Sequence, residues 1–181
     1  MIETETTPGD VTLGHARDGE SIQQRARQLA LHTPDGFLAF GFGSGLLTSA
    51  PGTLGTLAAV PVAVLVSALG ISPWLFLPLT FLVGIWLCNR ATRALEVDDY
   101  GGIVWDEMVG YWLVVSFFPL HWTWLAGAFV LFRGFDILKP WPISLVESSF
   151  DGGLGIMLDD VAAAVYAIVV LKFIQTMVLG G

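Results

Sequence analysis

The sequence predicts an all-α protein, an integral-membrane bundle of about five spanning helices with charged ends gathered on one side. Three observations lead to this fold class. Of the 181 residues, 54% are hydrophobic, and the mean hydropathy is +0.70. Only 13% are charged, whereas soluble domains carry roughly 25%. Most of these charges lie in clusters at the edges of uncharged apolar runs, a distribution typical of helices that cross a bilayer.

Net charge and cysteine content exclude several classes of protein. The formal net charge of −8 argues against a nucleic-acid partner, because nucleic acids select basic surfaces. Cys88 is the only cysteine, which excludes an internal disulfide and a cysteine-rich metal site. The first residues are acidic and polar and lack the features of a secretory signal, so insertion is expected to depend on the internal apolar segments.

The N-terminal region is expected to lie outside the bilayer core. Residues 1–34 are predicted to form an acidic, partly disordered arm, and residues 35–181 the membrane-embedded domain. Within the arm, Ser21–Leu31 is predicted to form a short helix at the membrane surface. The glycine-rich sequence 41–45 favours a short interfacial segment over a regular spanning helix.

Five apolar runs are candidate spans. They are Thr53–Leu69, Trp74–Asn89, Ile103–Phe118, Trp124–Phe132 and Val161–Leu179. Several are shorter than the roughly 20 residues that a bilayer crossing needs, so their charged ends are expected to complete the crossing.

Basic residues assign the sides of the membrane. Arg90 and Arg93 end the second span, and Arg133 and Lys139 end the fourth. The positive-inside rule places these ends in the cytoplasm, together with the starts of the first, third and fifth spans. The opposite face has almost no charge. This polarity indicates chemistry on one side of the membrane, not a pore or a path through it.

Six carboxylates are predicted to meet on the cytoplasmic side. They are Asp99, Asp106, Glu107, Asp136, Asp159 and Asp160. Such a group repels itself unless cations or protons intervene. Oxygen ligands without a usable His or Cys suit Mg²⁺ or Mn²⁺. A metal-bridged phosphate, with Arg133 and Lys139 neutralising the remaining charge, is the natural partner.

Structural roles compete with this interpretation. A helix N-terminus favours carboxylates, which explains Asp98 and Asp99. It explains Asp106 and Glu107 less well, because they are expected one to two turns into a helix that begins near residue 102. Asp159 is a candidate cap for the last helix, after a glycine-rich loop at residues 152–155.

Two further groups have alternative explanations. Arg133, Asp136 and Lys139 are spaced three apart, so an intrahelical salt-bridge ladder competes with a functional role. The sequence from Gly43 to Thr56 is rich in glycines and hydroxyls and precedes a helix, as in phosphate sites. Its small residues would also allow close helix packing.

The nucleophile is narrowed by exclusion. His121 lies in a turn on the opposite side, and there is neither a Cys-x5-Arg phosphate loop nor a visible Ser-His-Asp set. A metal-activated water with a carboxylate base is the simplest mechanism, and an aspartyl-phosphate intermediate is a weaker option. Lys172, alone in the fifth span, is expected to reach the outer interface.

Four motifs occur in a characteristic order. They are Phe42-Gly-Ser-Gly with Pro51-Gly-Thr-Leu-Gly, then Ile103-Val-Trp-Asp-Glu107, then Arg133-Gly-Phe-Asp-Ile-Leu-Lys-Pro-Trp-Pro142, and Gly153-Leu-Gly-Ile-Met-Leu-Asp-Asp160. Together they resemble the phosphatidylglycerophosphatase A family. The resemblance implies an Mg²⁺-dependent lipid phosphatase of the bacterial inner membrane, and the side assignment above places its site on the cytoplasmic face of a multi-pass protein. It would hydrolyse phosphatidylglycerol phosphate to phosphatidylglycerol and inorganic phosphate.

Matching positions carry expected roles from this resemblance. The residues expected to take part in catalysis are Asp106, Glu107, Asp136, Asp159 and Asp160. The residues expected to bind the metal are Asp99, Asp106, Glu107 and Asp160. The residues expected to bind the substrate are Arg133 and Lys139, together with Ser44, Thr53 and Thr56 from the glycine-rich and hydroxyl-rich segment. Asp98 is left out, because family members can have His at that position.

Other functions remain as alternatives. The substrate is alternatively another lipid phosphate, such as phosphatidic acid. A phosphotransferase of the CDP-alcohol type also uses aspartates at the membrane edge, but its Asp-Gly-x-x-Ala-Arg spacing is absent. An ion-coupled transporter would place charges near the midplane and on both sides.

Overall fold

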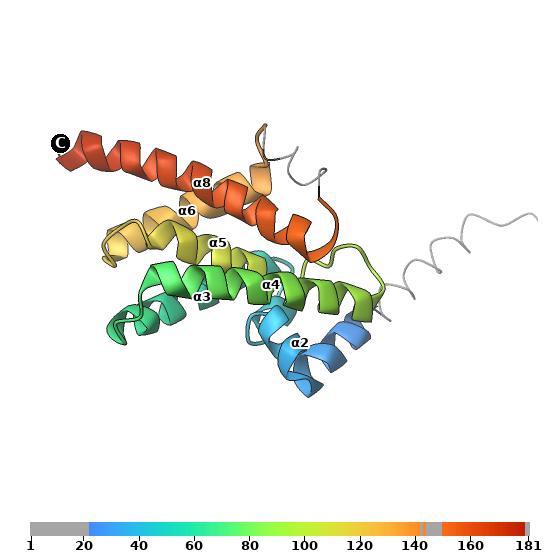
Figure 1. The fold of residues 1–181 in the computed structure, drawn as a ribbon. Helices are drawn as coiled ribbons and strands as arrows, with labels where there is room; N and C mark the ends of the chain where they lie inside the picture. The colour runs from blue at the N-terminus through green and yellow to red at the C-terminus, as the bar shows by residue number, and fades with distance from the viewer. Residues whose placement is uncertain (1–21, 142, 144–149, 180–181) are drawn as a thin grey trace, which may run out of the picture.

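The computed structural model describes residues 22–141, 143 and 150–179, so most of the predicted acidic arm lies outside it. The described chain is helical, which confirms the predicted all-α class (Figure 1). A helix at residues 22–32 comes first. It is followed by α2 (Pro34–Ala39), the 3₁₀-helix η1 (Ser44–Leu46), α3 (Pro51–Ala68), α4 (Pro73–Leu95), α5 (Trp105–Val115), α6 (Trp122–Leu138) and α8 (Gly152–Leu179).

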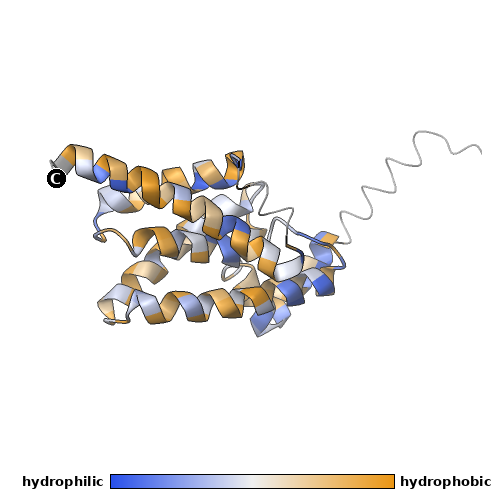
Figure 2. Ribbon diagram, turned by 45° about the horizontal axis from the view of Figure 1, so that its top comes forward, coloured by the Kyte–Doolittle hydropathy of each residue, from blue (hydrophilic) through white to orange (hydrophobic). Residues whose placement is uncertain are grey.

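Three helices of the described chain, α3, α4 and α8, are long and apolar enough to cross a membrane. Their outer faces carry exposed large side chains such as Leu57, Leu82 and Phe173. Figure 2 shows hydrophobic residues along most of these three helices. Exposed apolar side chains along helices of this length are suited to contact with lipid. Of the five predicted spans, α5 and α6 are shorter, with 11 and 17 residues.

Helix α5 lies at the centre of the bundle. Nine of its 11 residues are buried, and α3, α4, α6 and α8 all contact it. Its length of about 16 Å is roughly half of the hydrocarbon core of a bilayer. Three aromatic side chains bind it to backbone carbonyls of its neighbours at 2.9–3.1 Å: Trp105 to Thr80 of α4, Trp112 to Ala59 of α3, and Tyr111 to Leu125 of α6.

The two ends of the bundle differ in polarity. The α3–α4 and α5–α6 turns lie at the same end as the C-terminus (Figure 1). The α4–α5 loop, the start of α8 and the N-terminal helices lie at the other end, where hydrophilic residues gather (Figure 2). The clustered charges of the sequence are therefore at one end of the fold.

The N-terminal helices are attached to the polar end of α4. Arg25 of helix 22–32 forms an ion pair with Glu96 at 2.8 Å. Asp35 of α2 forms a second ion pair with Arg90. Burial raises the pKa of Asp35, but the hydrogen bond and charge of Arg90 outweigh this effect and hold the pKa below its usual value. Two ion pairs thus fix these helices beside the α4–α5 loop.

The start of α5 differs from the prediction. The helix begins at Trp105 and not near residue 102, so Asp106 and Glu107 lie in its first turn. The reason is tertiary: the N–H of Val104 donates to the carbonyl of Ala39 at 3.0 Å. This contact holds the residues before Trp105 out of the helix.

The start of α8 also corrects the prediction. A loop was expected at residues 152–155, but these residues form the first turn of α8, and Asp159 lies two turns inside the helix and does not cap it. The N–H of Gly153 donates to Oδ1 of Asn89 on α4 at 2.8 Å. A Cβ atom at Gly153 would lie 2.4 Å from the carbonyl oxygen of Ile85. Glycine is needed here because the backbones of α4 and α8 are in contact.

This contact predicts that Gly153→Ala destabilises the bundle. The added methyl group meets a backbone oxygen that cannot rotate away, so we expect a loss of about 1–3 kcal/mol in the free energy of unfolding. Gly134→Ala on α6 is the matched control, because a Cβ atom there meets nothing within 4 Å. Unfolding in detergent, followed by tryptophan fluorescence, measures both variants. Equal stability of the two variants would contradict the proposed α4–α8 contact.

Candidate active site

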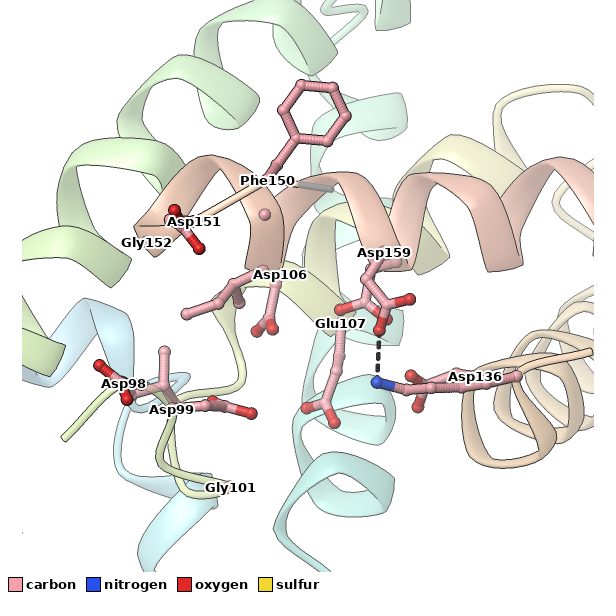
Figure 3. Close-up of a pocket in the computed structure, with 15 residues that line it drawn as sticks. Asp98, Asp99, Gly101, Asp106, Glu107, Asp136, Phe150, Asp151, Gly152 and Asp159 are labelled. Atoms are coloured by element: carbon pink, nitrogen blue, oxygen red, sulfur yellow. Dashed lines mark ion pairs between the residues drawn. The ribbon is translucent and has the colours of Figure 1, made fainter. Parts of the chain in front are cut away.

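A cavity of about 290 Å³ opens at the polar end of the bundle. Its walls come from the α4–α5 loop, the start of α5, the end of α6 and the start of α8 (Figure 3). Seven of the predicted site residues line it: Asp99, Asp106, Glu107, Asp136, Lys139, Asp159 and Asp160. The fold therefore brings together residues that are up to 61 positions apart in the sequence.

The carboxylates of this cavity face a shared space. Figure 3 shows Asp106, Glu107, Asp136 and Asp159 directed toward one another, with Asp99 turned toward them from the loop and Asp98 turned away. Asp106 is 8% exposed and Asp160 only 3%. Burying ionised carboxylates is unfavourable unless a cation, a proton or hydrogen bonds compensate. The site therefore needs compensating groups.

Arg133 supplies part of the compensation from behind the cavity. Its Nη1 donates to Oε1 of Glu107 at 3.0 Å and also to Asp136. All three side chains are only 13–14% exposed. Arg133 does not line the cavity, so in this structure it orients the two carboxylates. The pair with Asp136 is one step of the intrahelical ladder considered from the sequence.

Lys139 does not continue that ladder. Helix α6 ends at Leu138, and Lys139 has a left-handed backbone with φ of 42°. Its Nζ instead forms an ion pair with Oδ2 of Asp159 on α8 at 2.7 Å (Figure 3). The side chain is 33% exposed, which leaves it accessible from the cavity mouth. Lys139 is therefore the basic group best placed to meet an entering anion.

The start of α3 packs directly on Glu107. A Cβ atom at Gly52 would lie 1.7 Å from Oε1 of Glu107, and one at Gly55 would lie 3.2 Å from Oε2. A helix N-terminus stabilises a nearby carboxylate. The glycines of this motif thus act by close packing, the alternative that the sequence left open.

The predicted hydroxyl ligands do not line the cavity. Oγ1 of Thr56 donates to the Gly52 carbonyl of its own helix at 2.8 Å. Oγ of Ser44 is buried without a hydrogen-bond partner in the described chain. Thr53 lies near the start of α3, also outside the cavity lining. Substrate binding by these three residues stays a prediction.

Three residues with a place at the site were missed from the sequence. Asn89 holds the first turn of α8 through the N–H of Gly153, and Phe150 and Asp151 line the cavity. Asp151 directly precedes the glycines of the last motif, a position that was available as a signal. Asn89 had no such signal, because its contact joins residues 64 positions apart.

The donor atoms of the cavity fit a hard divalent cation. Asp106, Glu107 and Asp160 each have a buried carboxylate oxygen without a hydrogen-bond partner among the described residues. Oxygen-only donors of this kind suit Mg²⁺. Within residues 22–141, 143 and 150–179, no three acidic, His or Cys side chains are already arranged around one metal position. Binding a cation therefore requires rotation of these carboxylates.

The fold and the cavity define the class: an all-α protein with three helices that could cross a membrane and a carboxylate cavity at one end of the bundle. Comparison of the sequence with known proteins identifies the family. The family model described as phosphatidylglycerophosphatase A matches residues 37–175. The chain belongs to the phosphatidylglycerophosphatase A family, a family of lipid phosphomonoesterases, as the motifs indicated. This membership sets aside the transporter and phosphotransferase alternatives.

Individual relatives agree with the family match. A phosphatidylglycerophosphatase A of Haemophilus influenzae is 48% identical over 152 residues, which cover 82% of this chain and 93% of the relative. One of Escherichia coli is 41% identical, over 81% of this chain and 87% of the relative. A putative phosphatidylinositol-3-phosphatase of Bacteroides thetaiotaomicron is 37% identical, over 72% and 87%. No solved structure matches the chain.

The ion pairs of Arg133 predict a large effect of Arg133→Gln. The substitution leaves Glu107 and Asp136 buried without their cation, so we expect a loss of about 3–5 kcal/mol in the free energy of unfolding. Arg93→Gln removes an exposed positive charge from α4 and is the control. Adding Glu107→Gln to Arg133→Gln should recover part of the stability without recovering phosphatase activity. The interpretation fails if Arg133→Gln and Arg93→Gln unfold at the same denaturant concentration.

Proposed function

We propose that this protein hydrolyses the phosphomonoester of phosphatidylglycerol phosphate to phosphatidylglycerol and inorganic phosphate, using Mg²⁺ at the carboxylate cavity. Family membership supports the reaction class. The observation that carries the proposal of a metal-assisted mechanism is the group of buried carboxylate oxygens without partners. An alternative use of the cavity would have to explain why unsatisfied acids line it.

The charge balance of the cavity supports a metal-bridged phosphate. Among the described residues, eight acids and one base, Lys139, line the cavity. A phosphomonoester is itself an anion and would be repelled by this surface. Mg²⁺, when bound, would neutralise part of this charge, polarise the phosphate and lower the pKa of a bound water. Asp106, Glu107 and Asp160 are the groups that would hold it, with Asp99 reaching in from the loop.

The residues of the cavity have distinct roles in the proposed hydrolysis. A water oxygen attacks phosphorus, the bond from phosphorus to the terminal glycerol oxygen breaks, and that oxygen receives a proton. A buried carboxylate of the Asp106, Glu107, Asp160 group accepts the proton of the attacking water. Lys139 neutralises charge on the phosphate. Arg133 and Asp136 keep Glu107 in place.

The proposed orientation in the membrane rests on the basic residues at the polar end of the bundle. We place the cavity on the cytoplasmic face of a bacterial inner membrane, because Arg90, Arg93, Arg133 and Lys139 lie at that end of the bundle. Helices α5 and α6 then complete five crossings, with α5 shielded from lipid by its neighbours. The turns at Gly70 and His121 face the opposite side.

A second candidate substrate comes from one comparison. The Bacteroides thetaiotaomicron relative is named for an inositol lipid phosphate. The same cavity chemistry applies to any lipid phosphomonoester, including phosphatidic acid. Comparing kcat/KM for the three lipids in the same micelles ranks these candidates.

The metal-assisted mechanism predicts that phosphate release requires both Mg²⁺ and Asp106. We expect the purified protein to release phosphate from phosphatidylglycerol phosphate in the presence of Mg²⁺. This release should stop when EDTA is added. Asp106→Asn removes a buried charge at the metal position and should lower kcat about 100-fold or more.

Glu96→Gln provides the control for this experiment. Glu96 is 78% exposed and lies outside the carboxylate cavity, so activity should stay within about twofold of wild type. No phosphate release by the wild type would refute the proposed reaction. Full activity of Asp106→Asn or full activity in EDTA would refute the mechanism.

The proposed orientation predicts one-sided labelling of new cysteines. Cys88 is buried, so an impermeant thiol reagent should not label the wild-type protein. Asp98→Cys in the α4–α5 loop should be labelled only from the cytoplasmic side, and Thr123→Cys near the opposite turn only from outside. The reversed pattern would overturn the orientation, and labelling of both positions from one side would overturn the five crossings.

A further inference from the structure

A second cavity, of about 260 Å³, lies beside the carboxylate cavity. Gly101 lines both spaces, so the α4–α5 loop forms the wall between them. A Cβ atom at Gly101 would meet no atom within 4 Å. No side chain fills the space beside this glycine. A ligand that extends out of the carboxylate cavity therefore has an open place next to it.

The two cavities have opposite charge. Eight acids surround the first. Arg27, on the N-terminal helix, is the one charged residue among the described residues that line the second. The two spaces are thus suited to different ligand groups: the first to a metal-bound phosphate, and the second to an anion without a metal.

Arg27 keeps its hydrogen-bonding capacity. In the described part of the chain no ion pair or hydrogen bond involves its guanidinium, whereas Arg25, two positions away on the same helix, is paired with Glu96 at 2.8 Å. A guanidinium group binds phosphate through two parallel N–H donors. Arg27 is therefore available to a phosphate group that enters this cavity.

Neutral donors surround the same space. Oγ1 of Thr48 accepts a hydrogen bond from the N–H of Ala50 at 3.0 Å, which leaves its own hydroxyl proton to donate. The N–H groups of Gly101 and Gly102 make no hydrogen bond to other described residues. Pro51, the first residue of α3, also lines the cavity, so the positive end of that helix dipole adds to the field. The lining thus combines one cation with several uncharged donors.

We infer that this second cavity binds the phosphodiester group of the lipid substrate while the phosphomonoester occupies the carboxylate cavity. The inference rests on the proposed function. Phosphatidylglycerol phosphate carries two phosphate groups joined by a glycerol, and only the terminal one is removed. The acid-rich cavity repels the second phosphate, whereas Arg27 attracts it. Arg27 therefore selects lipids that have a phosphodiester next to the phosphomonoester, and disfavours phosphatidic acid, which has one phosphate.

Each of the two reaction products can be used as an inhibitor that tests one of the two binding sites. Phosphatidylglycerol retains the phosphodiester but lacks the phosphomonoester, so it should bind the second cavity. Inorganic phosphate corresponds to the phosphomonoester alone, so it should bind the carboxylate cavity. In neutral detergent micelles with Mg²⁺, Arg27→Gln should raise KM for phosphatidylglycerol phosphate and Ki for phosphatidylglycerol about 10-fold, the loss of one charge-assisted hydrogen bond. It should leave kcat and the Ki of inorganic phosphate within about twofold, because binding of the reacting group is unchanged.

Two further variants test whether Arg27 acts through its charge and its position. Arg27→Lys should recover part of the affinity for phosphatidylglycerol. Arg93→Gln removes an exposed arginine of α4 that lines neither cavity, and should leave all constants at wild-type values. Thermal unfolding of each variant is compared with wild type, since an exposed side chain should not affect it.

The outcomes distinguish this inference from the proposed function. A wild type that releases no phosphate refutes both. An active wild type that phosphatidylglycerol does not inhibit, or an Arg27→Gln variant with unchanged KM and Ki, refutes the phosphodiester site alone. Equal effects of Arg27→Gln and Arg93→Gln indicate general attraction to anionic lipid, and also refute it.

Discussion

The central constraint on this fold is the burial of a short helix that begins with two carboxylates. Helix α5 has 11 residues, too few to cross a bilayer alone. The residues before it are not helical, and their backbone polar groups cannot face lipid. The surrounding helices must therefore enclose α5 completely. Hydrogen bonds from Trp105, Tyr111 and Trp112 to three neighbours fix it in this position.

Enclosing α5 places Asp106 and Glu107 inside the protein but close to its polar end. The neighbouring helices accommodate this through small residues and one arginine. Gly52 allows the start of α3 to lie against Glu107, and Arg133 of α6 pairs with the same carboxylate. These groups compensate only part of the negative charge, because Asp106 and Asp160 retain oxygens without partners in the described chain. The remaining negative charge is the basis for the proposed binding of a cation and a phosphate in this cavity.

The loop between α4 and α5 lies between two cavities at the polar end of the bundle. It forms one wall of the carboxylate cavity and one wall of the cavity at Arg27. The N-terminal helices that carry Arg27 are held beside the loop by the ion pairs of Arg25 and Asp35. In the proposed binding mode, the two phosphates of a lipid headgroup would contact the buried acids and Arg27 on opposite sides of this loop.

The sequence by itself determined the all-α class, the apolar helices α3, α4 and α8, and the clustering of the acids at one end, because hydropathy and charge position depend on local composition. Its four motifs also determined the family. The tertiary structure decided where α5 and α8 begin, because Val104 and Gly153 bond to residues distant in the sequence. It also decided that Arg133 stands behind the cavity and that Lys139 pairs with α8. Partners of this kind arise only when separate helices pack, so no local pattern encodes them.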